Sequence, residues 1–101
     1  MIEPERRRRL RGEILEMARR FGVNGVSIEG LEGIYTRAGE HRMADNVGEA
    51  LLYLADKGYV AVNLQRDILS GIERRMVTIT AEGIDLLDDT IDQNPGVCIV
   101  R

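Results

Sequence analysis

The sequence is poor in thiol and imidazole groups: its 101 residues include one cysteine, Cys98, and one histidine, His41. A single cysteine cannot form an internal disulfide, and one cysteine with one histidine cannot by themselves build a zinc site. No apolar run approaches the roughly 20 residues that span a bilayer. The arginines near the N-terminus are not followed by the apolar stretch of a signal peptide. We therefore expect a cytoplasmic protein without a metal site or a membrane partner.

Signs of catalysis and of cofactor binding are equally scarce. Gly30 and Gly33 fall within a predicted helix, and no Gly-Lys-Ser/Thr follows them, so they do not form a phosphate-binding loop. His41 has no Ser, Asp or Cys arrangement nearby in the sequence that would support nucleophilic chemistry. The sequence predicts a protein that is not an enzyme, has no cofactor and shows no site for a small-molecule effector.

Charged residues of both signs are present, but they are unevenly distributed. The formal net charge is -3, which is not the overall signature of a nucleic-acid-binding protein. Positive charge gathers in residues 1–22 and 60–80, whereas residues 81–101 are acidic. Any nucleic-acid contact would therefore depend on a local basic surface.

Length and hydrophobic spacing predict one domain, residues 1–94, followed by a short apolar tail, residues 95–101. Three helices are predicted from apolar residues at helical spacing: Pro4–Phe21, about Ser27–Gly39 and about Met43–Lys57. The period then changes to that of strands at Tyr59–Arg66 and Arg75–Thr80, which form a hairpin. Thr80 is predicted to cap a last helix that ends at Asn94-Pro95-Gly96. The expected fold is mainly α with a β-hairpin, in the order helix-helix-helix-hairpin-helix.

Two stretches carry a resemblance to a known family. Residues 44–62, with Leu51, Leu54, Gly58, Tyr59 and Val60, resemble the third helix and first wing strand of winged helix-turn-helix proteins. Residues 77–91, with Ile79, Thr80 and Gly83, resemble the second wing strand and closing helix. The likeness covers roughly residues 8–92. Among these proteins the chain is similar to ArsR-like and MarR-like regulators and, through residues 86–97, to small winged-helix proteins of Mu-like phages and prophages.

The resemblance implies a winged-helix DNA-binding protein that regulates transcription. In such proteins the third helix reads the major groove and the wing contacts the backbone. Arg42 and Asn46 have the chemistry for guanine and adenine, Glu49 can accept from cytosine, and arginines of the hairpin suit phosphate. The predicted DNA-binding residues are Arg37, His41, Arg42, Asn46, Glu49, Tyr53, Arg66, Arg74 and Arg75. ArsR-like metal sensors use cysteine pairs, which this chain lacks, so metal sensing is not implied.

The sequence also leaves open a function other than DNA binding. Asp45, Glu49 and Asp56 repel phosphate, and together with the net acidic charge they favour a protein-interaction module that does not bind DNA. A homodimer is expected for the DNA-binding reading, because one small domain makes few base contacts. Its predicted surface is formed by the first helix and the apolar tail.

The tail carries an apolar run, Val97 to Val100, where chain ends are usually polar. We expect it to dock on its own domain or across a dimer interface, with Pro95-Gly96 supplying the turn. Cys98 is then expected to be a buried or partly buried thiol. The alternative is an unbound end.

Overall fold

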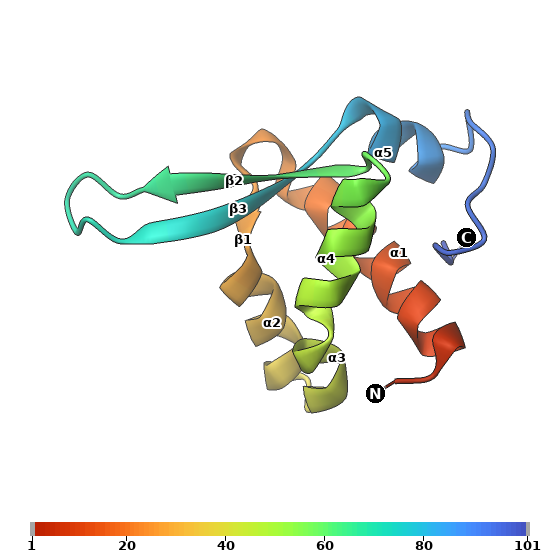
Figure 1. The fold of residues 1–101 in the computed structure, drawn as a ribbon, viewed down its shortest axis with the longest axis horizontal. Coiled ribbons are helices and arrows are strands. Elements are labelled where there is room, and N and C mark those ends of the chain that lie inside the picture. The colour runs from red at the N-terminus through yellow and green to blue at the C-terminus, as the bar shows by residue number, and fades with distance from the viewer. Residues whose placement is uncertain (1, 101) are drawn as a thin grey trace.

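The computed structural model describes residues 2–100 and is mainly helical, with one small antiparallel sheet (Figure 1). Its elements are α1 (Pro4–Phe21), the 3-10 turn η1 (Gly22–Asn24), β1 (Val26–Ser27), α2 (Ile28–Arg37), α3 (His41–Asp45), α4 (Val47–Asp56), β2 (Val60–Arg66), β3 (Glu73–Ile79) and α5 (Ala81–Leu87). The predicted combination of helices with a β-hairpin is confirmed. Among the described residues no helix is long and apolar enough to cross a membrane.

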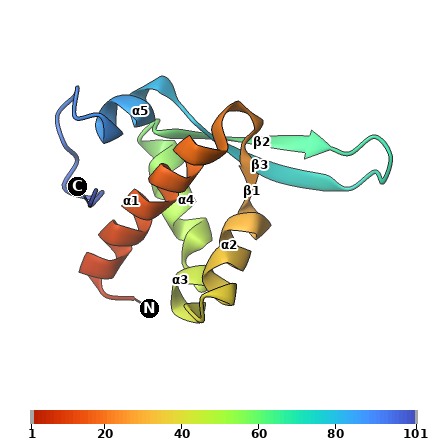
Figure 2. The same ribbon diagram turned by 180° about the vertical axis from the view of Figure 1, so that it is seen from behind.

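The sheet has the strand order β1-β3-β2, and its β2–β3 hairpin projects well beyond the helices (Figures 1 and 2). The register pairs Val60 with Ile79 at the base of the hairpin and Arg66 with Glu73 near its tip. The third strand, β1, was not predicted, because two residues are too short to show an alternating pattern. It pairs Val26 with Val77 and so fixes the start of α2 to the sheet.

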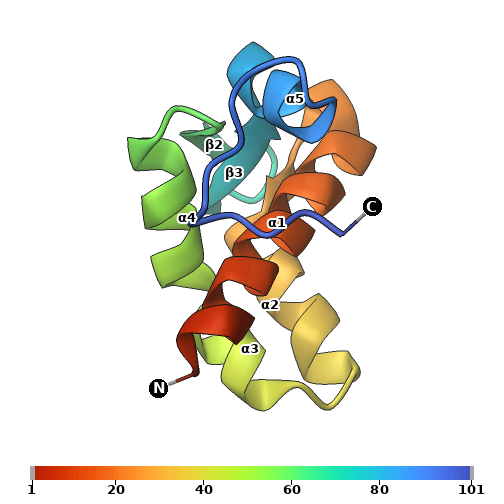
Figure 3. The same cartoon turned by 90° about the vertical axis from the view of Figure 1, so that its right-hand side faces the viewer.

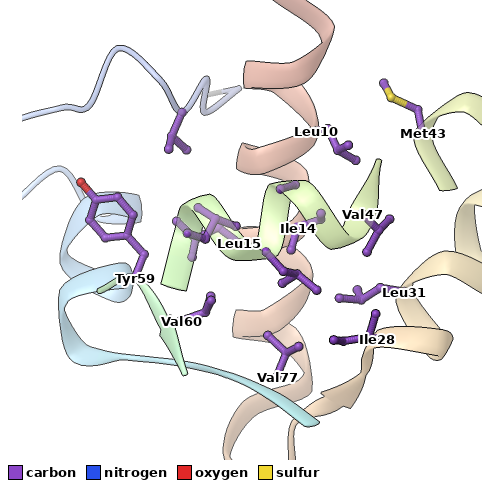
Figure 4. Close-up of a cluster of buried hydrophobic side chains, with 14 of the residues drawn as sticks. Leu10, Ile14, Leu15, Ile28, Leu31, Met43, Val47, Tyr59, Val60 and Val77 are labelled. Atoms are coloured by element: carbon purple, nitrogen blue, oxygen red, sulfur yellow. The ribbon is translucent and has the colours of Figure 1, made fainter. Parts of the chain in front are cut away.

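The core lies where α1, α2 and α4 meet the base of the sheet (Figure 4). Leu10, Ile14 and Leu15 of α1 are fully buried, as are Val47 of α4 and Val77 of β3. The apolar face of the first helix therefore faces the core, except for Phe21 at its end, which is 46% exposed. Burying such side chains provides the main driving force for the fold, because each removes apolar surface from water.

Local contacts fix several helix ends, among them the predicted cap at Thr80. The Ser27 hydroxyl accepts a hydrogen bond from the Gly30 N–H (2.9 Å), and the Thr80 hydroxyl accepts one from the Gly83 N–H (3.1 Å). After α4, Gly58 has φ +81°, a conformation that favours glycine. Residues Gly58 and Tyr59 donate back to the last turn of α4, which completes the C-cap and turns the chain into β2.

The prediction of one continuous third helix was wrong, because the segment breaks at Asn46 into α3 and α4. The Asn46 side-chain amide donates to the carbonyl of Arg42 (2.7 Å), and the Asn46 main-chain N–H bonds to Met43. The side chain thus takes the acceptor that an uninterrupted helix would give to the main chain. As a result, His41 and Arg42 belong to a short separate helix.

The last helix is also shorter than predicted, since α5 ends at Leu87. Asp89 has φ +62°, and the N–H groups of Asp89 and Thr90 donate back to Leu86 and Asp85. This is the hydrogen-bond pattern with which helices commonly end at glycine, formed here by an aspartate.

The C-terminal segment crosses α1 and docks within its own chain (Figure 3). The Cys98 N–H donates to the Arg8 carbonyl (2.9 Å), the Arg11 guanidinium donates to the Gly96 carbonyl (3.0 Å), and Val97 is buried. The predicted docking is therefore confirmed inside one chain, and the unbound end is excluded. The expectation of a buried or partly buried Cys98 was wrong: the residue is exposed, although its main-chain N–H is bonded to α1.

Candidate functional site

The side of α4 that faces away from the core is acidic and apolar. Its core face consists of Val47, Ala50, Leu51 and Leu54. Opposite them lie Glu49, Leu52 and Asp56, spaced so that they form one exposed stripe. Leu52 is 75% exposed, and no lysine, arginine or histidine occurs between Val47 and Asp56. The helix predicted to read DNA bases therefore presents two carboxylates and a leucine.

The predicted base-reading residues are not brought together on α4. His41 and Arg42 lie exposed on α3, and the Asn46 amide is held by the Arg42 carbonyl at the break between the two helices. Arg37 is exposed in the last turn of α2, with its guanidinium next to Gly33 of the same helix. These side chains remain accessible, but they come from separate elements.

Tyr53 was predicted to contact DNA, but it packs against other parts of the chain. The Arg11 guanidinium lies 3.7 Å from the centroid of the Tyr53 ring, and the Tyr53 hydroxyl donates to the Asn94 carboxamide oxygen (3.2 Å). Burial lowers the pKa of Arg11, an effect that charge interactions with Tyr53 and Glu49 partly offset. Tyr53 thus lies on the flank of α4 that faces α1 and the tail.

The three hairpin arginines are exposed and divided between two faces of the sheet. Because side chains alternate along a strand, Arg66 and Arg75 share one face, whereas Arg74 is on the other. Within residues 2–100 none of the three forms an ion pair. They are free to contact an anionic group on a partner.

A small apolar recess lies where α4 meets the hairpin, and we call it the α4–hairpin corner. Its volume is about 290 Å³, and it is lined by Ile28, Gly48, Leu51, Leu52, Ala55, Val62 and Arg75. Leu52 and Val62 are its exposed apolar side chains, and Arg75 supplies its one charge. The corner suits the docking of an apolar side chain with an anionic group beside it.

A larger cavity, about 470 Å³, opens elsewhere, between α1, α2 and the C-terminal segment. Its walls include Met17, Ile34 and Cys98, and one of its carboxylates, Glu13, accepts a hydrogen bond from Tyr35 (2.8 Å). Its charged lining residues are the carboxylates Glu13 and Glu16 and one arginine, Arg20. Across residues 2–100 no group of His, Cys, Asp or Glu side chains could hold a metal ion.

The chain was compared with protein-family models, curated proteins and solved structures. None of the three comparisons finds a match. Function is therefore inferred from the side chains of the site and their surroundings, and not from relatives.

The sequence reasoning missed the α4–hairpin corner. Leu52 falls outside the apolar stripe of its helix, and Val62 and Leu64 continue the apolar face of β2 past the last core contact. Apolar residues beyond the reach of a core are a detectable signal, because their exposure is costly unless a partner covers them.

Proposed function

We propose that this chain is a winged-helix domain that binds another protein through the α4–hairpin corner. The winged-helix assignment is supported by the element order helix-strand-helix-helix-helix-strand-strand-helix, in which α3 is a single short turn before α4, and by the sheet order β1-β3-β2. In this assignment α4 is the recognition helix and the β2–β3 hairpin is the wing. The surface between them is the one that such domains present to partners.

The exposed stripe of α4 is the observation that carries the proposal. A helix that enters the major groove lies between two rows of phosphates, which repel carboxylates such as Glu49 and Asp56. Leu52 between them has no hydrogen-bonding group with which to read a base edge. An exposed leucine beside the apolar Val62 is typical of a protein-docking surface.

The chemistry of the corner also describes the partner. Leu52 and Val62 select an apolar side chain, while Arg75 favours a carboxylate close to it. We therefore expect an apolar segment of a protein with at least one acidic residue beside the docked side chain.

Duplex DNA is a second candidate, favoured by the hairpin. Arg66, Arg74 and Arg75 are exposed and without ion pairs in the described chain, so a wing resting on the phosphate backbone would find donors there. Such binding would not depend on sequence, because phosphate contacts carry no base information.

One substitution separates the two candidates by the sign of its effect. Leu52→Lys places a positive charge on the exposed stripe of α4, which favours DNA and disfavours an apolar partner. Val23→Lys is the matched control, because Val23 is 95% exposed on η1, far in the sequence from α4 and the hairpin. Fluorescence anisotropy with a mixed-sequence duplex, at low and at physiological salt, measures the effect of these substitutions on DNA binding.

The effect on protein binding is measured with the protein partner itself. A protein recovered with the tagged chain after nuclease treatment is identified and purified. It is then titrated against the wild type, Leu52→Lys and Val23→Lys. The proposal predicts that Leu52→Lys weakens this binding by at least about tenfold, as for a central interface residue, and that Val23→Lys leaves it unchanged. Duplex binding by the wild type that Leu52→Lys strengthens and Arg75→Gln weakens would instead support the DNA-binding candidate.

A further inference from the structure

Strand β2 forms an open edge of the sheet along its whole length. The hydrogen bonds Thr80 N–H to Tyr59 C=O and Asp67 N–H to Ile72 C=O fix the pattern of the hairpin ladder. In that pattern Ala61, Asn63 and Gln65 direct their main-chain groups toward β3. The N–H and C=O groups of Val62, Leu64 and Arg66 therefore point outward, and no strand of the described chain pairs with them.

This edge lacks the features that usually prevent strands from pairing. Natural edge strands are protected by proline, by charged side chains, by bulges or by being short. β2 has seven residues in an unbroken register, no proline and a single charged residue, Arg66, at its end. By contrast, β3 carries the charged Arg75 and Glu73 beyond the point where β1 stops covering it. The β2 edge is thus the one suited to accept another strand.

We propose that two copies of the chain associate by antiparallel pairing of their β2 strands, about a two-fold axis at Leu64. This pairing places Leu64 opposite Leu64 of the second copy, and Val62 opposite Arg66. It joins the outward-facing groups through about six main-chain hydrogen bonds. No like charges meet directly, because each Arg66 faces a valine and Asn63 faces Gln65 on the other side of the sheet.

The tip of the hairpin supports a second copy as the occupant of this edge. Ile68 and Leu69 are each 96% exposed, yet the tip has a defined turn in which the Leu69 N–H donates to the Asp67 carboxylate (2.9 Å). Leu64 is four residues from both Val60 and Ile68. The two-fold pairing therefore brings Ile68 of one copy opposite Val60 of the other, where the strand leaves the core. The exposed tip is covered by the body of the second copy.

Pairing about this two-fold axis also limits the assembly to two copies. Each β2 edge is used once, so the pairing ends at a dimer and does not continue into a filament. It does not depend on the α4–hairpin corner, since the pairing uses the main chain of β2 and the corner is tested through Leu52. It also differs from a dimer built on α1 and the tail.

Sedimentation velocity of the full chain, from micromolar to several hundred micromolar, tests the proposal. The wild type is expected to be a dimer at the upper end of this range. Leu64→Lys and Leu64→Pro are expected to be monomers throughout, the latter because proline removes an N–H that faces outward and leaves the bonds to β3 intact. Val23→Lys is the control and is expected to dimerise like the wild type, and circular dichroism checks that every variant is folded.

A disulfide trap fixes the register. In a Cys98→Ser background, Leu64→Cys is expected to form a covalent dimer on mild oxidation, because position 64 lies on the two-fold axis. Ile72→Cys, on the other side of the hairpin turn, is expected to remain largely monomeric. A wild type that is monomeric at every concentration would overturn the proposal. A dimer that persists in both Leu64 variants and is lost on deleting residues 97–101 would overturn it as well.

Discussion

The guanidinium of Arg11 lies over the ring of Tyr53, 3.7 Å from its centroid, and this contact joins α1 to α4. The same arginine donates to the Gly96 carbonyl (3.0 Å), so it also holds the C-terminal segment. The Tyr53 hydroxyl reaches Asn94 from the other side. Three parts of the chain that are distant in sequence therefore meet at one pair of side chains.

Arg11→Ala is expected to lower the free energy of unfolding by about 1–3 kcal/mol, because it removes a cation–π contact and a hydrogen bond to a charged donor. Urea denaturation followed by circular dichroism measures this. Arg9→Ala, an exposed arginine on the same helix, is the control and is expected to change stability by less than about 0.5 kcal/mol. Equal effects of the two substitutions would show that the Arg11 contacts are not stabilising.

Much of the fold was predictable because its signals are local. Ser27 and Thr80 cap helices, and Gly58 ends one, through contacts within a few residues. Where two local outcomes compete, the sequence alone did not decide between them. Asn46 is compatible with a helix interior and also with a break, and the structure has the break. An aspartate with positive φ, as at Asp89, is rare enough that the end of α5 was misplaced.

The candidate site was harder to predict, because its residues are oriented by distant parts of the chain. Tyr53 is turned away from solvent by Arg11 and by Asn94, which lie 42 and 41 positions away in the sequence. The sequence placed Arg66, Arg74 and Arg75 in the hairpin correctly, but it did not reveal that α4 would present Leu52 between two acids. Residue chemistry was visible in advance, whereas side-chain direction was not.

The tail passes close to α1 at Gly12, where an added Cβ would collide with the Cys98 carbonyl. Gly12→Ala is therefore expected to destabilise the domain by about 1–3 kcal/mol, by displacing the docked segment. Gly48→Ala is the matched control, because Gly48 is also helical but has open space around it. It is expected to stabilise the chain by up to about 1 kcal/mol through helix propensity.

Thermal unfolding measures both alanine variants. A chain ending at residue 96 distinguishes the cause: without the tail, Gly12→Ala is expected to be neutral or stabilising, since its collision partner is gone. If Gly12→Ala remained equally harmful in the shortened chain, its effect would have to arise within α1.

Thr80 joins the end of β3 to the start of β2. Its hydroxyl donates to the Gly58 carbonyl (2.6 Å) and accepts from the Gly83 N–H (3.1 Å). Thr80→Val keeps the shape but removes both bonds, and the expected loss of stability is about 1–3 kcal/mol, measured by urea denaturation. Thr36→Val, at an exposed threonine of α2, is the control and is expected to stay within about 0.5 kcal/mol of the wild type. Equal losses in both variants would contradict the assigned role of Thr80.

The final prediction concerns pH and the hydrogen bond from Tyr35 to Glu13 (2.8 Å). Burial and this bond raise the pKa of the Tyr35 phenol above its ordinary value of about 10. The folded chain therefore holds the phenolic proton more tightly than the unfolded chain does. The resulting stabilisation is complete below about pH 10 and is lost as the pH rises further, toward the folded-state pKa.

Urea denaturation between about pH 8 and pH 11 measures this loss. Above about pH 10 the free energy of unfolding is expected to fall more steeply for the wild type than for Tyr35→Phe, which has no proton to release at this position. Glu13→Gln keeps an acceptor for the phenol but removes the carboxylate charge that helps to raise the pKa, so its curve is expected to lie between the other two. Parallel curves for the wild type and Tyr35→Phe would show that the folded chain does not perturb the Tyr35 pKa.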